Sequence, residues 1–200
     1  MHEREKKSAG NIARRPRNAE KSRGRILEAA VRFFQERAYD KVHMREIAAA
    51  ANVDVALINR YFTSKKQLFA AACAEARKQH TLFSGGTFEE CVSEPYVDMI
   101  TGKSLDAKAH ALVAMIISGD NPDIAPIVRE SFREAALVMA DMLGDRDNLT
   151  PAYVLMAYGI GSVLLMDSFD DADKVGIDRK MFIAMHEKII GWLRDNAASK

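Results

Sequence analysis

Cysteine is scarce in this 200-residue sequence, and the two that occur exclude several classes of protein. Cys73 and Cys91 stand too far apart for a C-x-x-C pair, so neither a disulfide framework nor a zinc site is indicated. The first residues, Met1–Ile12, lack the apolar core of a signal peptide. The longest uncharged run, Ala152–Met166, is shorter than the roughly 20 residues that a membrane-spanning helix needs. We therefore expect a cytoplasmic protein that is neither secreted nor embedded in a membrane.

Catalytic and cofactor motifs are also missing. We find no nucleophile elbow, phosphate loop or paired-carboxylate arrangement that rises above chance. Gly159 and Gly161 do not extend to a dinucleotide fingerprint, because Leu164 occupies the final glycine position and no strand precedes them. His110 and His186 each lack a second histidine at metal-binding spacing. The sequence therefore predicts no cofactor and no metal, and it disfavours the alternative of a helical enzyme whose basic N-terminal part is incidental.

Charge is divided unevenly along the chain. Residues 1–66 hold 16 lysines and arginines against 8 aspartates and glutamates, whereas residues 67–200 hold 13 against 20. The net charges of the two parts, +8 and −7, add to the +1 of the whole chain. Such an asymmetry is typical of a protein whose basic part alone meets a polyanion such as DNA. Lys65 and Lys66 lie well beyond any N-terminal tail, so a basic tail does not explain the whole imbalance.

Hydrophobic periodicity predicts helices throughout and no strands. Residues 1–17 carry many charges, among them Arg14, Arg15 and Arg17, and little apolar content, so they are predicted to form a mobile basic arm. A first helix is predicted from about Asn18, because apolar residues then recur at helical spacing. The predicted fold class is therefore all-α.

Two short helices joined by a tight turn are predicted after the first helix. Apolar residues from Met44 to Ala51 fit a helix of about two turns. Asn52, which follows, is a residue type that tolerates the left-handed backbone of a tight turn. Asp54 is predicted to cap a third helix, Val55–Tyr61, by accepting hydrogen bonds from the free backbone N–H groups of its first turn.

Further helices are predicted beyond this pair. Ser64, with Gln67 three residues later, matches a capping box at the start of a fourth helix that runs to about His80. Thr150, which precedes a proline, and Asp178 are predicted to cap the last two helices. The helices predicted for the C-terminal part are Phe88–Ile100, Ser104–Ser118, Ile124–Leu143, Pro151–Ser168 and Asp178–Asn196.

A group of residues between Arg25 and Phe69 forms a pattern without gaps: Arg25, Ile26, Leu27, Ala29, Ala30, Phe33, Tyr39, Ile47, Ala48, Ala51, Val53, Tyr61, Phe62, Ser64, Lys65, Leu68 and Phe69. This pattern resembles the DNA-binding region of the TetR family of transcriptional regulators. The resemblance implies a three-helix helix-turn-helix DNA-binding domain at residues 18–66 and a helical ligand-sensing and dimerisation domain at residues 67–200. Asn52 stands where the family usually has the turn glycine, and Asn59 stands where a tyrosine is common.

The third helix is the candidate reader of DNA, because a helix fits the major groove, where base edges can be told apart. Asn59 is a candidate reader of adenine, and Arg60 is a second candidate for base contact. Tyr61 and Lys65 are candidates for phosphate contact, Lys65 also because it joins a helix N-terminus, which attracts anions.

Other candidate DNA contacts flank this helix. His43 is a candidate for phosphate contact and Arg45 for base contact, and the three arginines of the basic arm are candidates for the minor groove. Alternative interpretations are that Tyr61 is partly core, that His43 merely caps the second helix, and that the arm is merely solvated. The residues at the start of the third helix complete the candidate DNA-binding set: Asp54, Val55 and Ala56.

The last two predicted helices are candidates for a dimer interface, as the resemblance also implies. The helix 151–168 carries no charge from Ala152 to Met166, so it cannot present an ordinary polar face to water. Gly159, Gly161 and Ser162 are small enough to let a second helix approach, although the glycines could instead accommodate the protein's own core. The candidate interface residues are Tyr153, Ala157, Ile160, Gly161, Leu164, Phe182, Met185, Ile189 and Leu193.

The resemblance further implies a repressor that binds palindromic operator DNA as a homodimer and is released by a small molecule. Methionines among the apolar positions of the C-terminal part, such as Met115 and Met156, adapt to irregular cavities. An apolar or amphipathic effector is therefore the predicted ligand, and the sequence assigns no residue to its site. Two alternatives stay open, namely control by a protein partner and a regulator that receives no signal.

Overall fold

The computed structural model of the protein describes residues 3–78, 86–88, 90, 114–116, 118–167 and 178–197; for residues 3–18, 163, 164, 166, 167, 179 and 197 it describes only the backbone. The elements are α1 (Glu3–Glu36), the 3-10 turn η1 (Tyr39–Lys41), α2 (Met44–Ala50), α3 (Val55–Phe62), α4 (Lys65–Lys78), α7 (Ala125–Met142), α8 (Thr150–Asp167) and α9 (Arg179–Ala197). None of the residues in these described ranges forms a strand, which confirms the predicted all-α fold class.

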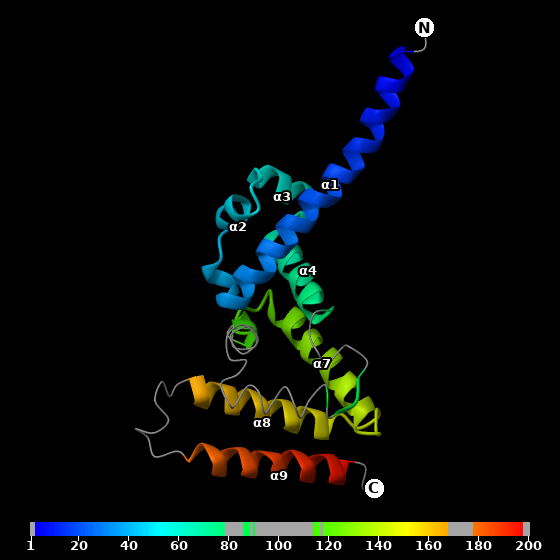
Figure 1. Ribbon diagram of the computed structural model, residues 1–200. Helices are drawn as coiled ribbons and strands as arrows, with labels where there is room; N and C mark the ends of the chain where they lie inside the picture. The colour runs from blue at the N-terminus through cyan, green and yellow to red at the C-terminus, as the bar shows by residue number, and fades with distance from the viewer. Residues whose placement is uncertain are drawn as a thin grey trace.

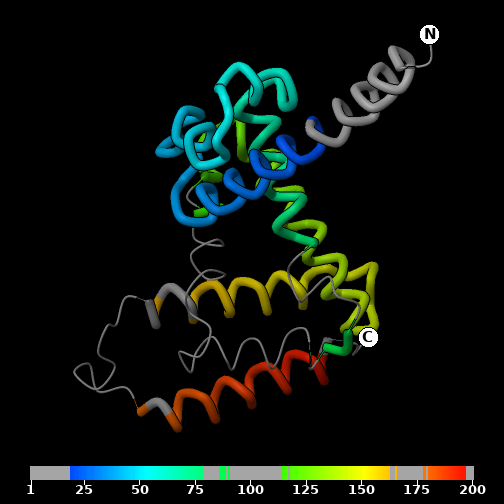
Figure 2. Tube along the Cα trace, turned by 45° about the horizontal axis from the view of Figure 1, so that its top comes forward, coloured from blue at the N-terminus to red at the C-terminus, as the bar shows by residue number. Residues whose placement is uncertain are grey.

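The helices form a head and a body. We use head for α1–α4 with η1, and body for the described chain from Ala114 onward. In Figure 1, α7 runs from the head down to α8 and α9, which lie side by side and antiparallel; Figure 2 shows the same pairing from another direction. α4 packs against both α1 and α7, so it joins the two parts.

α1 begins earlier than the sequence predicts. The predicted start is near Asn18, after an arm, whereas the helix runs continuously from Glu3 to Glu36. Most residues in the range 3–17 are Glu, Lys, Arg or Ala, which are strong helix formers, and their propensity outweighs Gly10 and Pro16. The predicted helix start is therefore wrong. The charged residues of this segment are soluble in water, but Glu, Lys and Arg also have a high helix propensity.

The helix-turn-helix forms through the local signals that the sequence predicts. Asn52 has a positive φ of 51° in the turn between α2 and α3. The carboxylate of Asp54 accepts a hydrogen bond from the N–H of Ala56 at 2.7 Å and caps α3. Ser64 Oγ accepts from the N–H of Gln67 at 3.1 Å and caps α4 in the same way. These contacts confirm the predicted turn and both predicted caps.

The core of the head has three aromatic rings at its centre. The ring centroid of Phe34 lies 5.0 Å from that of Phe69 and 6.0 Å from that of Tyr39, and the Tyr39 and Phe69 centroids are 5.3 Å apart. Two residues of the body, Ile124 and Val128, belong to the same buried cluster. The apolar core of the head therefore includes residues from beyond the domain boundary that the sequence predicts after residue 66. The division into two domains stays a prediction.

The starts of the body helices agree with the sequence to within a residue. Asp178 Oδ1 accepts hydrogen bonds from the N–H groups of Lys180 and Met181 at 2.9 and 3.1 Å, which confirms the cap of α9. Thr150 is the first residue of α8 rather than its cap, because Asn148 Oδ1 accepts from the Thr150 N–H at 3.1 Å. Most residues of the predicted helices 88–100 and 104–118 lie outside the described residues.

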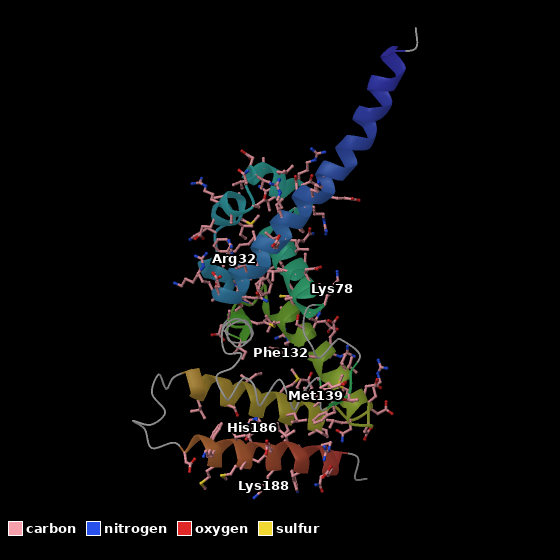
Figure 3. The ribbon with its side chains drawn as sticks, viewed as in Figure 1. Arg32, Lys78, Phe132, Met139, His186 and Lys188 are labelled. Carbon is pink, nitrogen blue, oxygen red and sulfur yellow. The ribbon has the colours of Figure 1, made fainter. Side chains whose placement is uncertain are left out.

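A polar pair is enclosed in the second buried cluster, which joins α7, α8 and α9. The Tyr158 hydroxyl and His186 Nδ1 are 2.7 Å apart, and the His186 ring also stacks on Phe182 with centroids 6.0 Å apart. Figure 3 shows His186 between α8 and α9, and Lys188 on the far side of α9. Burial lowers the pKa of the His186 imidazole to about 4, so the ring is neutral at neutral pH.

Some classes of site are not found in the part of the chain that the structure describes. Among the described helices, none has the length and apolar content that crossing a bilayer requires. No three His, Cys, Asp or Glu side chains within the described ranges gather closely enough to hold a metal ion. Cys73 is buried as a free thiol, and burial raises its pKa to about 11, so the reactive thiolate is suppressed.

Candidate nucleic-acid interface

α3 packs one side into the head and turns the other outward. Ile58 and Phe62 are buried, whereas Asn59 and Arg60 are exposed. Because neighbouring residues on a helix point about 100° apart, the buried pair fixes the direction of the exposed pair. The guanidinium of Arg23 on α1 stacks over the Phe62 ring, 5.1 Å from its centroid, and covers the end of the helix. Both predicted base-reading side chains are thus held at an outer surface.

The start of α2 is fixed by hydrogen bonds to its neighbours. The Glu46 carboxylate accepts from the guanidinium of Arg37 and from the backbone N–H of His43, each at 2.9 Å. These two contacts, the Arg37 one above all, lower the pKa of the Glu46 carboxyl. His43 is the exposed N-cap residue of α2, as the alternative interpretation expects, and Arg45 is exposed in its first turn.

Lys65 lies half-buried in the first turn of α4. Its Nζ is 4.2 Å from the centroid of the Tyr39 ring, within the range of a cation–π contact. Burial lowers the pKa of the Lys65 ammonium, and the nearby Asp40 carboxylate opposes this effect. The ring holds the cation at the end of α4 where free backbone N–H groups also attract anions. The Lys65 ammonium, which is the predicted phosphate contact, is therefore held in position by the Tyr39 ring.

The remaining DNA-binding candidates differ in their surroundings. Tyr61 and Val55 are half-buried and pack against the core of the head, so Tyr61 is partly core as the alternative interpretation expects. Ala56 and Asp54 are exposed, and the Asp54 carboxylate is engaged in capping α3. The side chains of three candidates lie outside the described residues: Arg14, Arg15 and Arg17.

Thr63 has an unusual backbone that the sequence analysis misses. Its φ of 57° and ψ of −38° are rare for a β-branched residue. The Ser64 N–H donates to the Phe62 carbonyl across it, which makes a γ-turn. This turn lets α4 begin almost directly after α3, and it brings Lys65 close to the end of α3. The only sequence signal is that the end of one helix and the cap of the next leave no room for a loop.

A groove lies between α7 and α8 and has a volume of about 690 Å³. Apolar side chains line it, among them Phe132, Met156 and Ile160, together with Arg129, Glu130 and Arg133. The Glu130 carboxylate pairs with the Arg133 guanidinium at 3.4 Å. The sequence assigns no residue to an effector site, so this groove is a candidate that only the structure reveals. Its apolar lining suits the apolar body of a small molecule, and Arg129 is the cation that an anionic group of that molecule would meet.

The predicted interface residues on α8 lie on the side that faces away from the core. Tyr153 and Ala157 are exposed, and Ile160 and Gly161 are half-buried, whereas the intervening Leu155 is buried. The side chain of one candidate lies outside the described residues: Leu164. Val154 and Leu165 are also exposed and extend this apolar side, although the sequence analysis does not include them.

The exposed stripe of α9 is rotated from the predicted one. Met185 and Ile189 are exposed as expected, but Phe182 stacks on His186 and Leu193 packs against the second buried cluster. The other large exposed apolar side chains of this helix are ones that the sequence analysis misses: Met181, exposed by 61%, and Trp192, exposed by 64%. The candidate interface on α9 therefore shifts toward these two residues.

Comparisons with known proteins agree with the architecture. Residues 26–72 match the model of a family described as bacterial regulatory proteins, tetR family. GusR of Salmonella enterica has a similar structure, with a TM-score of 0.60 at 20% identity over 88% of this chain and 93% of its own. A TetR transcriptional regulator from Rhodococcus sp. RHA1 gives a TM-score of 0.52 at 23% identity over 90% of this chain and 97% of its own.

No curated protein matches the sequence, so the assignment rests on the family model and the fold. The matched residues 26–72 contain η1, α2 and α3 in full and most of the core of the head. The solved structures share the fold over nearly their whole lengths. Residues 26–72, which hold the helix-turn-helix, therefore match the model of the tetR family of bacterial regulatory proteins, and the chain as a whole has the fold of these solved structures.

Proposed function

We propose that this regulator is a repressor that binds a palindromic operator as a homodimer and is released by a small amphipathic molecule. The observation that carries the DNA-binding part is the outward pair Asn59 and Arg60 on α3, with the Lys65 cation at the adjacent N-terminus of α4. Asn59 has the donor and acceptor that pair with an adenine edge, while Lys65 supplies a charge for the phosphate backbone.

The apolar side of α8 and α9 supports a homodimer. Seven large apolar side chains are exposed in the described part of the chain, and all of them lie on these two helices. Among the described residues, a Cβ atom built on Gly161 meets no atom within 4 Å, so the described part of the core does not require glycine there. Glycine costs about 1 kcal/mol relative to alanine inside a helix, and close approach of a second α8 would offset that cost.

DNA contact should depend on two side chains in different ways. The unaltered protein is used to select duplexes from random DNA, and a two-fold symmetric site is the expected product. Lys65→Ala should weaken binding about tenfold to selected and arbitrary duplexes alike and lower the slope of log affinity against log salt by about one. Asn59→Ala should lower the affinity for the selected duplex by roughly 5- to 100-fold and relax the sequence preference at one base pair.

A lysine at the opposite end of α4 provides the control. Lys78 is exposed and paired with Glu75 at 2.9 Å, remote in sequence from α3, so Lys78→Ala should leave affinity unchanged. An unchanged salt slope for Lys65→Ala contradicts its phosphate role. Failure of the protein to enrich any duplex contradicts the proposed function as a whole.

Release by an effector should follow thermodynamic linkage. A molecule bound in the groove between α7 and α8 should raise the melting temperature of the free protein. The operator duplex should lower the protein's affinity for this molecule, and the molecule should lower the affinity for the operator by the same factor. Met156→Trp, which fills the groove, should abolish the shift. Equal effector affinity with and without operator rejects this mechanism. Control by a protein partner, or regulation without a signal, then becomes the better account.

A further inference from the structure

The segment before α7 is hydrogen-bonded to the head at two points. Ser118 is buried; its Oγ accepts from the backbone N–H of Tyr39 at 2.9 Å and donates to the carbonyl of Ala114 at 2.6 Å. Asn121 Nδ2 donates to Asp40 Oδ1 at 2.9 Å. Tyr39 and Asp40 are neighbours in η1, so two side chains of the body hold one turn of the head.

The residues that hold η1 are themselves fixed. Asn121 Oδ1 accepts from the N–H of Asp123 at 2.9 Å, and the Asn121 carbonyl accepts from the N–H groups of Ile124 and Ala125. Ile124 is fully buried in the core of the head. Hydrogen bonds and burial therefore hold both the side chains and the backbone of the segment 118–124, which restricts its movement relative to η1.

η1 in turn bears the cation of the candidate DNA interface. The Lys65 ammonium lies 4.2 Å from the centroid of the Tyr39 ring. The same ring also packs against the ring of Phe69. The Asp40 carboxylate acts electrostatically on Lys65 as well. The two hydrogen bonds from the body thus end on Tyr39 and Asp40, the residues that act on Lys65, the proposed phosphate contact.

We propose that Ser118 and Asn121 are positioning residues for operator binding, which hold η1 so that the Tyr39 ring keeps the Lys65 ammonium in place for a DNA phosphate. This inference rests on the proposed DNA-binding function. Loss of either hydrogen bond lets η1 shift, and Lys65 then loses the ring that directs it. The body contributes to DNA affinity through these two side chains without touching DNA.

A double-mutant cycle between Ser118 and Lys65 tests this route. Affinity for the selected duplex is measured for the unaltered protein, Ser118→Ala, Lys65→Ala and the double variant. Ser118→Ala should lower affinity about fivefold, the equivalent of one hydrogen bond, when Lys65 is present. The same change should have less than a twofold effect when Lys65 is alanine, because the group that Ser118 positions is then absent.

A matched serine separates positioning from general stability. Ser162 is also buried and donates to the carbonyl four residues back, at 2.8 Å from Tyr158 O, but it lies in α8 away from the head. Ser162→Ala should lower the melting temperature about as much as Ser118→Ala and leave DNA affinity unchanged. Ser118→Thr, which keeps the hydroxyl, should restore affinity.

Equal losses from Ser118→Ala in both Lys65 backgrounds overturn the inference while the proposed function stands. If Ser118→Ala does not fold, Asn121→Ala replaces it in the cycle, since the hydrogen bond from Asn121 to Asp40 is exposed. An Asn121→Ala affinity equal to that of the unaltered protein also overturns the inference. If the unaltered protein binds no duplex, the proposed function fails and this inference fails with it.

Discussion

Replacing Gly161 with arginine should convert the proposed dimer into a folded monomer that binds the operator at least 100-fold more weakly. The affinity falls because one head spans one half-site only, and the second half-site then binds without the advantage of linkage. A long cationic side chain in an apolar helix contact has no partner for its charge, so the contact is lost. Light scattering gives the mass, and binding to the selected duplex gives the affinity.

The variant should stay folded, which makes the test clean. No atom of the residues that the structure describes lies within 4 Å of a Cβ at Gly161, and arginine favours helix over glycine by somewhat less than 1 kcal/mol. Gly191 in α9 offers a matched control, since it is equally open and has the exposed, charged Glu187 and Asp195 on its helix side. Gly191→Arg should therefore remain dimeric. A dimeric Gly161→Arg protein with unchanged operator affinity would falsify this interface.

Acid should weaken the fold through His186 by about 3 kcal/mol between pH 6.5 and pH 4. The folded-state pKa is lowered to about 4 from an unfolded value of 6.5, because burial disfavours the charged ring. Above pH 6.5 the ring is neutral in both states and the contribution to stability is complete. As the pH falls toward 4, only the unfolded chain takes up the proton, and stability declines; below pH 4 both states are protonated and the decline stops.

Chemical unfolding at a series of pH values measures this effect. His186→Gln keeps a polar group beside the Tyr158 hydroxyl but does not titrate, so its free energy of unfolding should fall less over this interval. The difference between the two curves removes the background from carboxylates elsewhere in the chain. Parallel curves for the two proteins would mean that the buried imidazole does not control acid stability.

Local signals in the sequence are sufficient for the helix-turn-helix. Asn52, Asp54 and Ser64 were predictable because their backbone preferences and capping bonds involve residues within three positions along the chain. The contact of Lys65 with Tyr39 and the bond of Ser118 to Tyr39 were not predictable in this way. They join segments far apart in sequence, and no periodicity records which side chains meet there.

The helices of the body show a second limit of the same reasoning. On α9 an apolar stripe drawn through Phe182 and Leu193 is consistent with helical spacing, but so is one through Met181 and Trp192. The choice depends on which side faces α8, and the pair of Tyr158 with His186 decides it. Periodicity defines that a helix has an apolar side, whereas tertiary packing selects which part of that side is enclosed.

The core shared by head and body determines how this protein could be recombined with others of the same fold. A fragment cut at residue 66 leaves behind Phe69, Ile124 and Val128, which complete the cluster around Phe34 and Tyr39. Joining the head to the body of another protein would therefore require transplanting α4 and the segment 118–128 with it. Exchanging the outward side chains of α3 leaves this shared core untouched, so it is the safer way to change what the proposed DNA interface binds.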